Sequence, residues 1–187
     1  SGTHLIKVLG TEKLKGELIS TILPFNDNFL IVTSEKGIYE YDGVSLKEWN
    51  NPANQFLIKN QVFCGMAINP SKYAFGTVQS GLLICDASGN ILQQIDRKNG
   101  LQNNTVLCLN VDQYENLWLG LDNGIDYIEI NSPLSFFSYS IGLSAGYAAV
   151  LFDGILYLGT NQGVFAKEWE ALQKGSNEPF QLIPNTQ

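Results

Sequence analysis

The sequence predicts an all-β protein built from a repeated four-stranded unit, and two features carry this prediction. Residues 117–130 read LWLGLDNGIDYIEI and residues 156–169 read LYLGTNQGVFAKEW. Both give alternating apolar residues, a glycine, a polar pair, a second glycine and further apolar residues. Weaker copies of this pattern occur at residues 30–42 and 73–86. A pattern written four times in one chain indicates an internal repeat, which should decide the fold before any single element is considered.

The period of the repeat identifies the type of unit. The second glycine of each copy, at Gly37, Gly81, Gly124 and Gly163, follows the previous one after 44, 43 and 39 residues. A period near forty is typical of propeller blades, and it also occurs in helical repeats. Apolar residues here alternate with a period of two, as in Leu117, Leu119 and Leu121, which indicates strands rather than helices. We therefore predict a β-propeller fragment of about four four-stranded antiparallel blades.

The third copy shows how each blade is expected to divide. A polar turn and the sequence Asp-Asn-Gly separate its first three apolar runs, and Asp-Asn-Gly between alternating runs is a strong hairpin signal. The four strands are expected at residues 105–111, 117–121, 125–130 and 134–140.

The same division along the chain gives one orphan strand and four blades. The strand, at residues 4–9, is expected to be the last strand of a preceding blade, and the blades run from 17–50, 61–97, 105–140 and 145–184. In the last blade an insertion at residues 166–175 predicts a short helix closed by Gly175, which delays the fourth strand. The longest connection between blades, residues 50–60, is expected to shape a rim.

Residues 1–187 are thus expected to form part of a larger propeller. Propellers close with four to eight blades, and residues 182–187 end where another blade would begin. Exposed blade faces and sheet edges associate readily. We therefore expect this chain to associate with other blades or with a second copy.

Composition excludes several classes of partner. The chain is 44% hydrophobic and 16% charged, which provides a packed core and argues against disorder. Its formal net charge is −7 and no cluster of lysine and arginine occurs, so binding to nucleic acid or to anionic membrane surfaces is not expected. Residues 130–152 are uncharged and long enough to cross a bilayer. Pro133, several serines and the repeat itself instead place strands there, so no membrane insertion is expected.

The three cysteines, Cys64, Cys85 and Cys108, form no C-x-x-C pair. Cys64 and Cys108 stand at matching points of two repeats, which makes a disulfide between them improbable. We predict that the cysteines are small buried apolar residues.

The sequence offers no catalytic or metal-binding set. His4 is the single histidine, which removes serine and cysteine triads and histidine-based metal sites. Asp122, Asp126 and Glu129 are spread along a turn and a strand, so acid–base catalysis by these carboxylates stays open but is not favoured. No cofactor, metal or enzymatic activity is therefore expected of this chain.

The third repeat also resembles a known repeat family. Its residues 100–124 resemble the regulator-propeller repeat, and the matching residues are Gly100, Leu101, Asn104, Val106, Asp112, Asn116, Leu117, Trp118, Gly120, Asp122, Asn123 and Gly124. Leu121 stands where the family usually has threonine, whereas Gly76-Thr77 and Gly159-Thr160 keep the usual pair. The first repeat keeps Thr33 and Gly37 and little else.

Such repeats build the sensor portion of hybrid two-component regulators of Bacteroidetes. In that family the propellers lie in the periplasm, ahead of an immunoglobulin-like domain, a membrane helix and a histidine kinase. The resemblance implies a non-enzymatic, periplasmic sensor module for signal transduction, often one that responds to glycan breakdown products. Two alternatives stay open, a propeller enzyme (lyase or hydrolase) acting on polysaccharide and a passive scaffold for protein interactions, because a fold alone does not fix a function.

Polar residues of turns and blade connections are the candidate ligand contacts, because both kinds of segment are expected at one end of the blades. Their amide and carboxylate groups suit the hydroxyl groups of an oligosaccharide, although turns themselves also require such residues. The candidates are Asn103, Asn104, Asp122, Asn123, Asn161 and Gln162.

Trp118 is a further aromatic candidate. We match it with Tyr73, Tyr157 and Leu30 of the other repeats and expect this position to pack between blades rather than to contact ligand.

Overall fold

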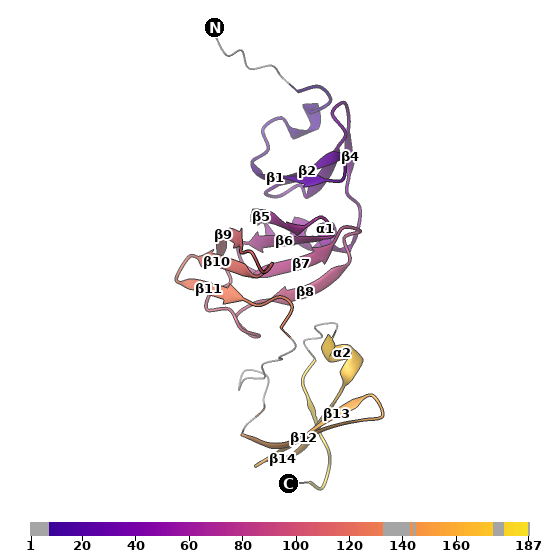
Figure 1. Cartoon of the computed structure of the whole chain (residues 1–187), viewed down its shortest axis with the longest axis vertical. Coiled ribbons are helices and arrows are strands. Elements are labelled where there is room, and N and C mark those ends of the chain that lie inside the picture. The colour runs from indigo at the N-terminus through magenta and orange to yellow at the C-terminus, as the bar shows by residue number, and fades with distance from the viewer. Residues whose placement is uncertain (1–7, 133–142, 144, 174–177, 187) are drawn as a thin grey trace.

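The computed structural model describes residues 8–132, 143, 145–173 and 178–186, and it places their strands in four antiparallel sheets (Figure 1). The first sheet contains β1 (Ile19–Phe25), β2 (Asn28–Thr33), β3 (Ile38–Tyr41) and β4 (Leu46–Glu48). The second contains β5 (Val62–Asn69), β6 (Lys72–Thr77), β7 (Leu82–Asp86) and β8 (Ile91–Ile95). The third contains β9 (Val106–Val111), β10 (Leu117–Leu121) and β11 (Ile125–Ile128), and the fourth contains β12 (Gly146–Phe152), β13 (Ile155–Thr160), β14 (Gly163–Glu168) and β15 (Gln181–Leu182).

This arrangement confirms the predicted fold class of a propeller fragment with about four antiparallel blades. In every sheet the strands pair in chain order, as expected of a blade. The predicted fourth strand of the third blade, at 134–140, lies outside the described residues. Residues 4–7 of the predicted orphan strand also lie outside them, and Val8 and Leu9 are not part of a strand.

Within the described residues, three helical segments accompany the sheets. A short 3-10 helix, η1 (Glu12–Leu14), precedes β1. Helix α2 (Trp169–Gln173) separates β14 from β15, in agreement with the predicted delay of the last strand, whereas the predicted closing residue Gly175 lies outside the described part of the chain.

The third segment, α1 (Pro52–Asn60), occupies the long connection 50–60 that was expected to shape a rim, and its helix was not predicted. Asn51 caps its first turn by accepting a hydrogen bond from the backbone N–H of Asn54 at 2.9 Å, and Pro52 provides a preset first helical residue. The helix is held by packing, since Ala53 and Leu57 are fully buried.

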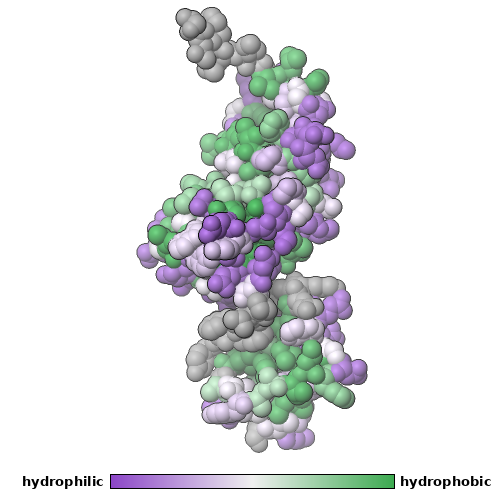
Figure 2. Space-filling model, in the orientation of Figure 1, coloured by the Kyte–Doolittle hydropathy of each residue, from purple (hydrophilic) through white to green (hydrophobic). Residues whose placement is uncertain are grey.

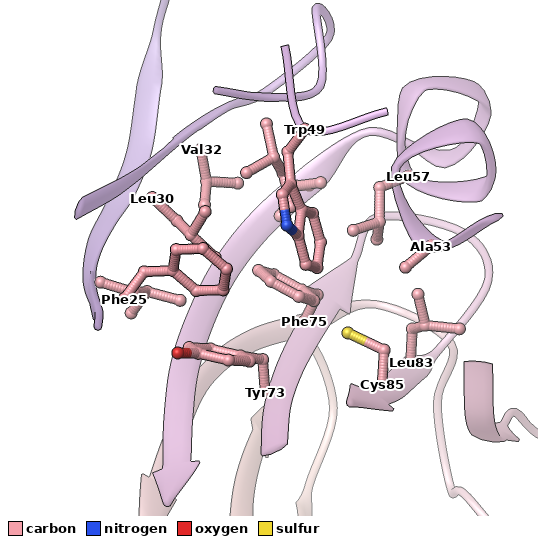
Figure 3. Packing of buried hydrophobic residues seen from close by; sticks show 13 residues of the cluster. Phe25, Leu30, Val32, Trp49, Ala53, Leu57, Tyr73, Phe75, Leu83 and Cys85 are labelled. Carbon is pink, nitrogen blue, oxygen red and sulfur yellow. The ribbon is translucent and has the colours of Figure 1, made fainter. Parts of the chain in front are cut away.

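The first two sheets share a core to which α1 contributes. Phe25, Leu30 and Val32 of the first sheet meet Tyr73 and Phe75 of the second (Figure 3). Leu57 and Ala53 close the cluster on the side of the helix, and Trp49 lies 6.2 Å from Phe25 between ring centroids. Full burial of an aromatic or branched side chain contributes about 1.5–3 kcal/mol, so this cluster is a major source of stability.

The second and third sheets share another core on the opposite face of β6. Successive side chains of a strand point to opposite faces. Tyr73 and Phe75 accordingly face the first sheet, while Ala74 belongs to the cluster with Leu117 and Leu119 of the third sheet. The second sheet is therefore covered on both faces.

The strand register aligns the repeats and corrects one prediction. Gly76 pairs with Cys64, and Gly120 pairs with Cys108, so the two glycines are equivalent. Two residues before them stand Ala74 and Trp118, which are therefore equivalent, whereas the prediction matched Trp118 with Tyr73. That match was wrong by one residue, and a shift of one residue along a strand exchanges its two faces.

The same strand pairs show that the sulfur atoms of Cys64 and Cys108 fill the space above the paired glycines. A methyl group added to Gly76 would lie 2.6 Å from Sγ of Cys64, and one added to Gly120 would lie closer still to Sγ of Cys108. All three cysteines are free. Burial raises the pKa of the Cys64 and Cys85 thiols to about 12. Cys108 is exposed, so the prediction of a buried apolar role is wrong for that residue.

The fourth sheet has a core of its own. Leu143, Leu156 and Phe180 are buried together, with Leu158 and Trp169 packed against them. In Figure 1 this sheet lies apart from the other three, and every residue of its first strand, β12, is exposed.

Candidate functional site

Turns and connections meet at one end of the first three sheets. Four backbone hydrogen bonds of about 3 Å link them, and the donors and acceptors are Val62 N to Ser34 O, Val78 N to Gln61 O, Gly81 N to Asn104 O, and Asp122 N to Thr105 O. Three of them join a turn between second and third strands to the connection between two sheets, and the bond from Val62 joins such a turn to the first residue of β5. The expected common end of turns and connections is therefore present, and we call it the rim.

A threonine clamp shapes two of the rim turns and the corresponding turn of the fourth sheet. The hydroxyl of Thr77 donates to the carbonyl of Gly81 at 2.9 Å and accepts from the backbone N–H of Ser80 at 2.9 Å. Thr33 and Thr160 bond the carbonyls of Gly37 and Gly163 in the same way. The Gly-Thr pair of the repeat is thus explained by turn closure. Leu121 has no hydroxyl, and its N–H bonds the Gly124 carbonyl directly at 3.0 Å.

The opposite ends of the sheets carry a second motif that also serves structure. The carboxylate of Asp112 accepts hydrogen bonds from the backbone N–H groups of Tyr114 at 2.8 Å and Asn116 at 2.9 Å. Desolvation raises the pKa of Asp112, but the bonds from Asn116 and Tyr114 outweigh it and hold the pKa below its usual value. The Asp-x-x-x-Asn pattern of the family therefore closes a turn.

The strongest candidate site lies on the rim where α1 ends. Asn60 is the last helical residue, and Gln61 turns the chain into β5 with a positive φ of 49°. A cavity of about 410 Å³ opens there, lined by Glu35, Ile58, Lys59, Asn60, Gln61 and Gln79. The lining comes from the β2–β3 turn, the end of α1 and the β6–β7 turn, so three separate segments converge on it.

The chemistry of this rim cavity is polar on nearly every side. It offers three carboxamides, one carboxylate and one ammonium group, and only Ile58 is apolar. The Gln61 side chain donates to Oε1 of Glu35 at 3.0 Å, and the Ser80 hydroxyl donates to Oδ1 of Asn60, which holds two of the side chains in place. Carboxamides donate and accept in fixed directions, which is what recognition of a polyhydroxylated ligand needs.

The predicted candidates on the third sheet lie on the rim, and two of them bond the backbone. Oδ1 of Asn103 accepts from the N–H of Thr105 at 2.9 Å, and Oδ1 of Asn104 accepts from the N–H of Arg97 at 2.8 Å. Asp122 and Asn123 are exposed in the β10–β11 turn. The structure thus brings these four residues to one end of the third sheet, and ligand contact by them stays a prediction.

The other two candidates belong to a different sheet. Asn161 and Gln162 are exposed in the β13–β14 turn of the fourth sheet. The backbone N–H of Gln162 donates to the Thr160 hydroxyl at 3.1 Å, as in the other threonine clamps. The structure does not bring them to the rim of the first three sheets, and their role in binding also stays a prediction.

The lining of the rim cavity was not predicted from the sequence. The connection 50–60 was expected to shape a rim, but the lining residues Glu35, Lys59, Asn60, Gln61 and Gln79 were not among the candidates. The pair Asn51-Pro52 is a helix-start signal that could have revealed α1 and so directed attention to its end.

A larger cavity has a different character. About 720 Å³ opens on the face of the first sheet that points away from the second, between Ile22, Phe29 and Ile31 on one side and Val8 and Leu14 on the other. Its lining is mainly apolar, which suits packing against another protein surface better than recognition of a polar ligand.

The described residues contain no group of three or more His, Cys, Asp or Glu that could hold a metal ion.

The carboxylate of Asp126, one of the three carboxylates considered for acid–base catalysis, has a structural role. It accepts hydrogen bonds from the backbone and the side chain of Gln102 at 2.9 and 2.7 Å, so it ties β11 to the preceding connection. None of the helices seen in the described residues combines the length and apolar character needed to cross a membrane.

Comparison with known proteins adds structural relatives. No protein-family model matches the sequence, and no curated protein matches it either. Among solved structures, the chain is similar to the extracellular domain of the putative hybrid two-component system BT3049 of B. thetaiotaomicron, with 16% identity and a TM-score of 0.49 over 90% of this chain. It is also similar to that of the putative one-component system BT4673 of the same organism, with 23% identity and a TM-score of 0.49 over 91% of this chain.

This chain spans 22% of each of those two extracellular domains. A third similar structure is the computationally designed Ika4 protein, with 14% identity and a TM-score of 0.50, where the match covers 90% of this chain and 99% of Ika4. The similarity to Ika4 concerns the fold alone. The structural neighbours of this propeller fragment thus include extracellular domains of two-component systems.

Proposed function

We propose that this chain is part of the extracytoplasmic, periplasmic ligand-sensing region of a two-component regulator, and that the rim cavity binds its ligand. The observation that carries the proposal is the regulator-propeller motif of the third repeat. In the structure, its Asp112, Asn116 and Gly120 take the turn and strand roles that a blade requires. The proposal does not rest on the similar extracellular domains, whose TM-scores lie below 0.5.

The ligand class follows from the cavity chemistry. Three carboxamides and a carboxylate around about 410 Å³ suit the hydroxyl groups of a short oligosaccharide. Lys59 adds a cation that would pair with a uronic-acid carboxylate. We propose a glycan breakdown product as the ligand. Binding then acts on signalling only as far as the ligand prefers one of two conformations of the sensor.

The test is whether short neutral and uronic-acid oligosaccharides bind to the chain. Titration calorimetry and thermal unfolding measure that binding. A ligand that binds only the native state raises stability, by about 2.7 kcal/mol at a hundred times its dissociation constant. We expect Gln79→Ala to weaken binding about tenfold or more, which corresponds to about 1.4 kcal/mol. The matched control is Gln113→Ala, because Gln113 is an exposed glutamine in the turn at the opposite end of the third sheet.

Two outcomes would contradict the proposal, and each favours one alternative. Cleavage of an oligosaccharide during incubation would indicate the polysaccharide-degrading enzyme. Failure of every oligosaccharide to bind or to shift the melting temperature would indicate the passive scaffold.

A further inference from the structure

Asparagine followed by glycine occurs twice in the chain, as Asn99-Gly100 and Asn123-Gly124. Asparagine is one of the thermolabile residues. The backbone nitrogen of the next residue can attack its side-chain carbonyl carbon, and glycine hinders this attack least because it has no Cβ. Both pairs are exposed, and Figure 2 shows hydrophilic surface over the middle of the molecule, where the second and third sheets lie. Solvent therefore reaches both pairs, and a difference in their reactivity has to come from their hydrogen bonds.

The side chain of Asn99 is held at both of its polar atoms. Its Oδ1 accepts a hydrogen bond from the backbone N–H of Asp96 at 2.6 Å, and its Nδ2 donates to the carbonyl of Gln94 at 2.8 Å. The backbone N–H groups of Asn99 and Leu101 both donate to the carbonyl of Asp96, at 3.2 and 2.9 Å. The Asn99 side chain must therefore break both of its bonds before its Cγ can turn toward the nitrogen of Gly100.

The side chain of Asn123 is not held in this way. In the described part of the chain it forms no hydrogen bond, and the backbone N–H of Gly124 forms none either. The attacking nitrogen and the carbon that it attacks are thus both unengaged, in a turn that is exposed at all three of its residues, 122–124.

The turn that carries Asn123 also lacks a contact that its counterpart has. In the fourth sheet, where the turn has the same length, the N–H of Gln162 donates to the Thr160 hydroxyl at 3.1 Å. Leu121 stands at the position of Thr160 and has no hydroxyl, so the N–H of Asn123 lacks this acceptor. The turn is closed by the bond from the Leu121 N–H to the Gly124 carbonyl at 3.0 Å. Exposed segments with few bonds open locally at a low free energy.

We propose that Asn123 is a site of spontaneous deamidation and that Asn99 is protected from it. The nitrogen of Gly124 gives its proton to solvent and forms a bond to Cγ of Asn123, and the bond from Cγ to Nδ2 breaks. The Nδ2 group takes a proton from solvent and leaves as ammonia, and a cyclic imide remains in the chain. Water then opens the ring at either carbonyl and yields aspartate or isoaspartate. A water molecule is consumed for each ammonia released, and nothing is oxidised or reduced.

The reaction changes both the charge and the backbone of the rim. It places a second carboxylate beside Asp122, and in isoaspartate it inserts a methylene group into the backbone of the turn. The N–H of Asp122 donates to the carbonyl of Thr105 at 3.0 Å, which ties this turn to the connection between the second and third sheets. A change in the turn therefore acts on a contact that shapes the rim. The inference does not depend on the proposed function.

The test follows both pairs in one sample. The full chain is incubated in mildly alkaline buffer, where the attacking nitrogen loses its proton more readily, and fragment-ion mass spectrometry assigns the conversion to each asparagine. We expect Asn123 to convert at least about tenfold faster than Asn99, since Asn99 must first lose two hydrogen bonds. The matched control is the same chain unfolded in guanidinium chloride. Both asparagines are then followed by glycine and held by no fixed contact, so their rates should become similar.

The variant Asn123→Gln gives a second readout. Glutamine has to close a larger ring, which is slower, so the acidic species that accumulates in ion-exchange chromatography of the unmodified chain should be absent. Asn123→Asp marks where that species elutes.

Three results would overturn the inference. The first is conversion of Asn99 as fast as that of Asn123 in the folded chain. The second is a folded chain in which neither asparagine converts while both convert in guanidinium chloride. The third is an acidic species that persists in Asn123→Gln, which would assign the deamidation to another asparagine.

Discussion

The second and fourth sheets are built from the same strand pattern but differ in what surrounds them. The second sheet lies between two others, and every residue of β6 apart from Lys72 is buried. The fourth sheet packs against α2 and Phe180, and β12 is exposed along its length. The comparison shows that a blade strand does not bury its own side chains. Its neighbours do, which is why stability in a repeat protein is largely a sum over adjacent pairs.

The largest expected effect tests this difference with one residue type. Phe75→Ala removes a fully buried ring between the first two sheets and should lower the free energy of unfolding by about 3–5 kcal/mol. Phe152→Ala removes a ring that is 70% exposed and should change it by no more than about 0.5 kcal/mol. Urea unfolding followed by circular dichroism measures both. Equal losses would show that β12 is covered by something other than the described residues.

A second prediction compares how the second and fourth sheets make stability depend on pH. Folding raises the pKa of the Cys64 and Cys85 thiols from 9.0 to about 12, so above about pH 9 the unfolded chain loses protons that the folded chain retains. Stability should be unaffected by these thiols below about pH 9 and should fall by about 1 kcal/mol per pH unit for each thiol above it. Unfolding in urea at neutral pH and at about pH 10 measures the loss.

The variant Cys85→Ala serves as the control for that experiment. It is less stable at neutral pH, because it opens a small cavity, but its stability should depend less on alkaline pH. The fourth sheet contains no cysteine. A pH dependence that is unchanged by Cys85→Ala would rule out the Cys85 thiol as a cause of it.

The third comparison is between two threonine clamps. Thr77→Val leaves the N–H of Ser80 without its bond beside a fully buried side chain and should cost about 1–3 kcal/mol. Thr160 makes the same contacts in a half-buried turn of the fourth sheet, where water replaces them, so Thr160→Val should cost about 0.5–1 kcal/mol. Thermal unfolding of the two variants gives the order. A reversed order would mean that the turn of the fourth sheet is the better shielded of the two.

Much of the fold could be predicted from the sequence because the signals are local. Strand alternation and the turn signal at Asp-Asn-Gly lie within a few residues of one another, and they predicted β10 and β11 closely. Helix α1 was missed because burial of Ala53 and Leu57 holds it, and that packing is a property of the assembled sheets.

The candidate site was harder to predict than the fold. The rim cavity joins Glu35, Gln79 and the end of α1, which are far apart in the chain and meet only when the first two sheets stack. Residues such as Asn103 and Asn104 were singled out by type, and the structure shows that their side chains close backbone turns. The match of Trp118 with Tyr73 was wrong because turns of unequal length shift the register, which only strand pairing fixes.

The pairing of a cysteine with a glycine across two strands limits the order in which these positions can change. At Gly76 even alanine would collide with Cys64, and Cys64→Ala alone leaves space unfilled, so the two sites are energetically coupled and their substitution effects should not add. In the fourth sheet the residue paired with the glycine is an alanine instead of a cysteine. Ala148 stands opposite Gly159, and a methyl group added there would meet the alanine Cβ at an ordinary 3.5 Å. The glycine that cannot be replaced in the second and third sheets can therefore be replaced in the fourth.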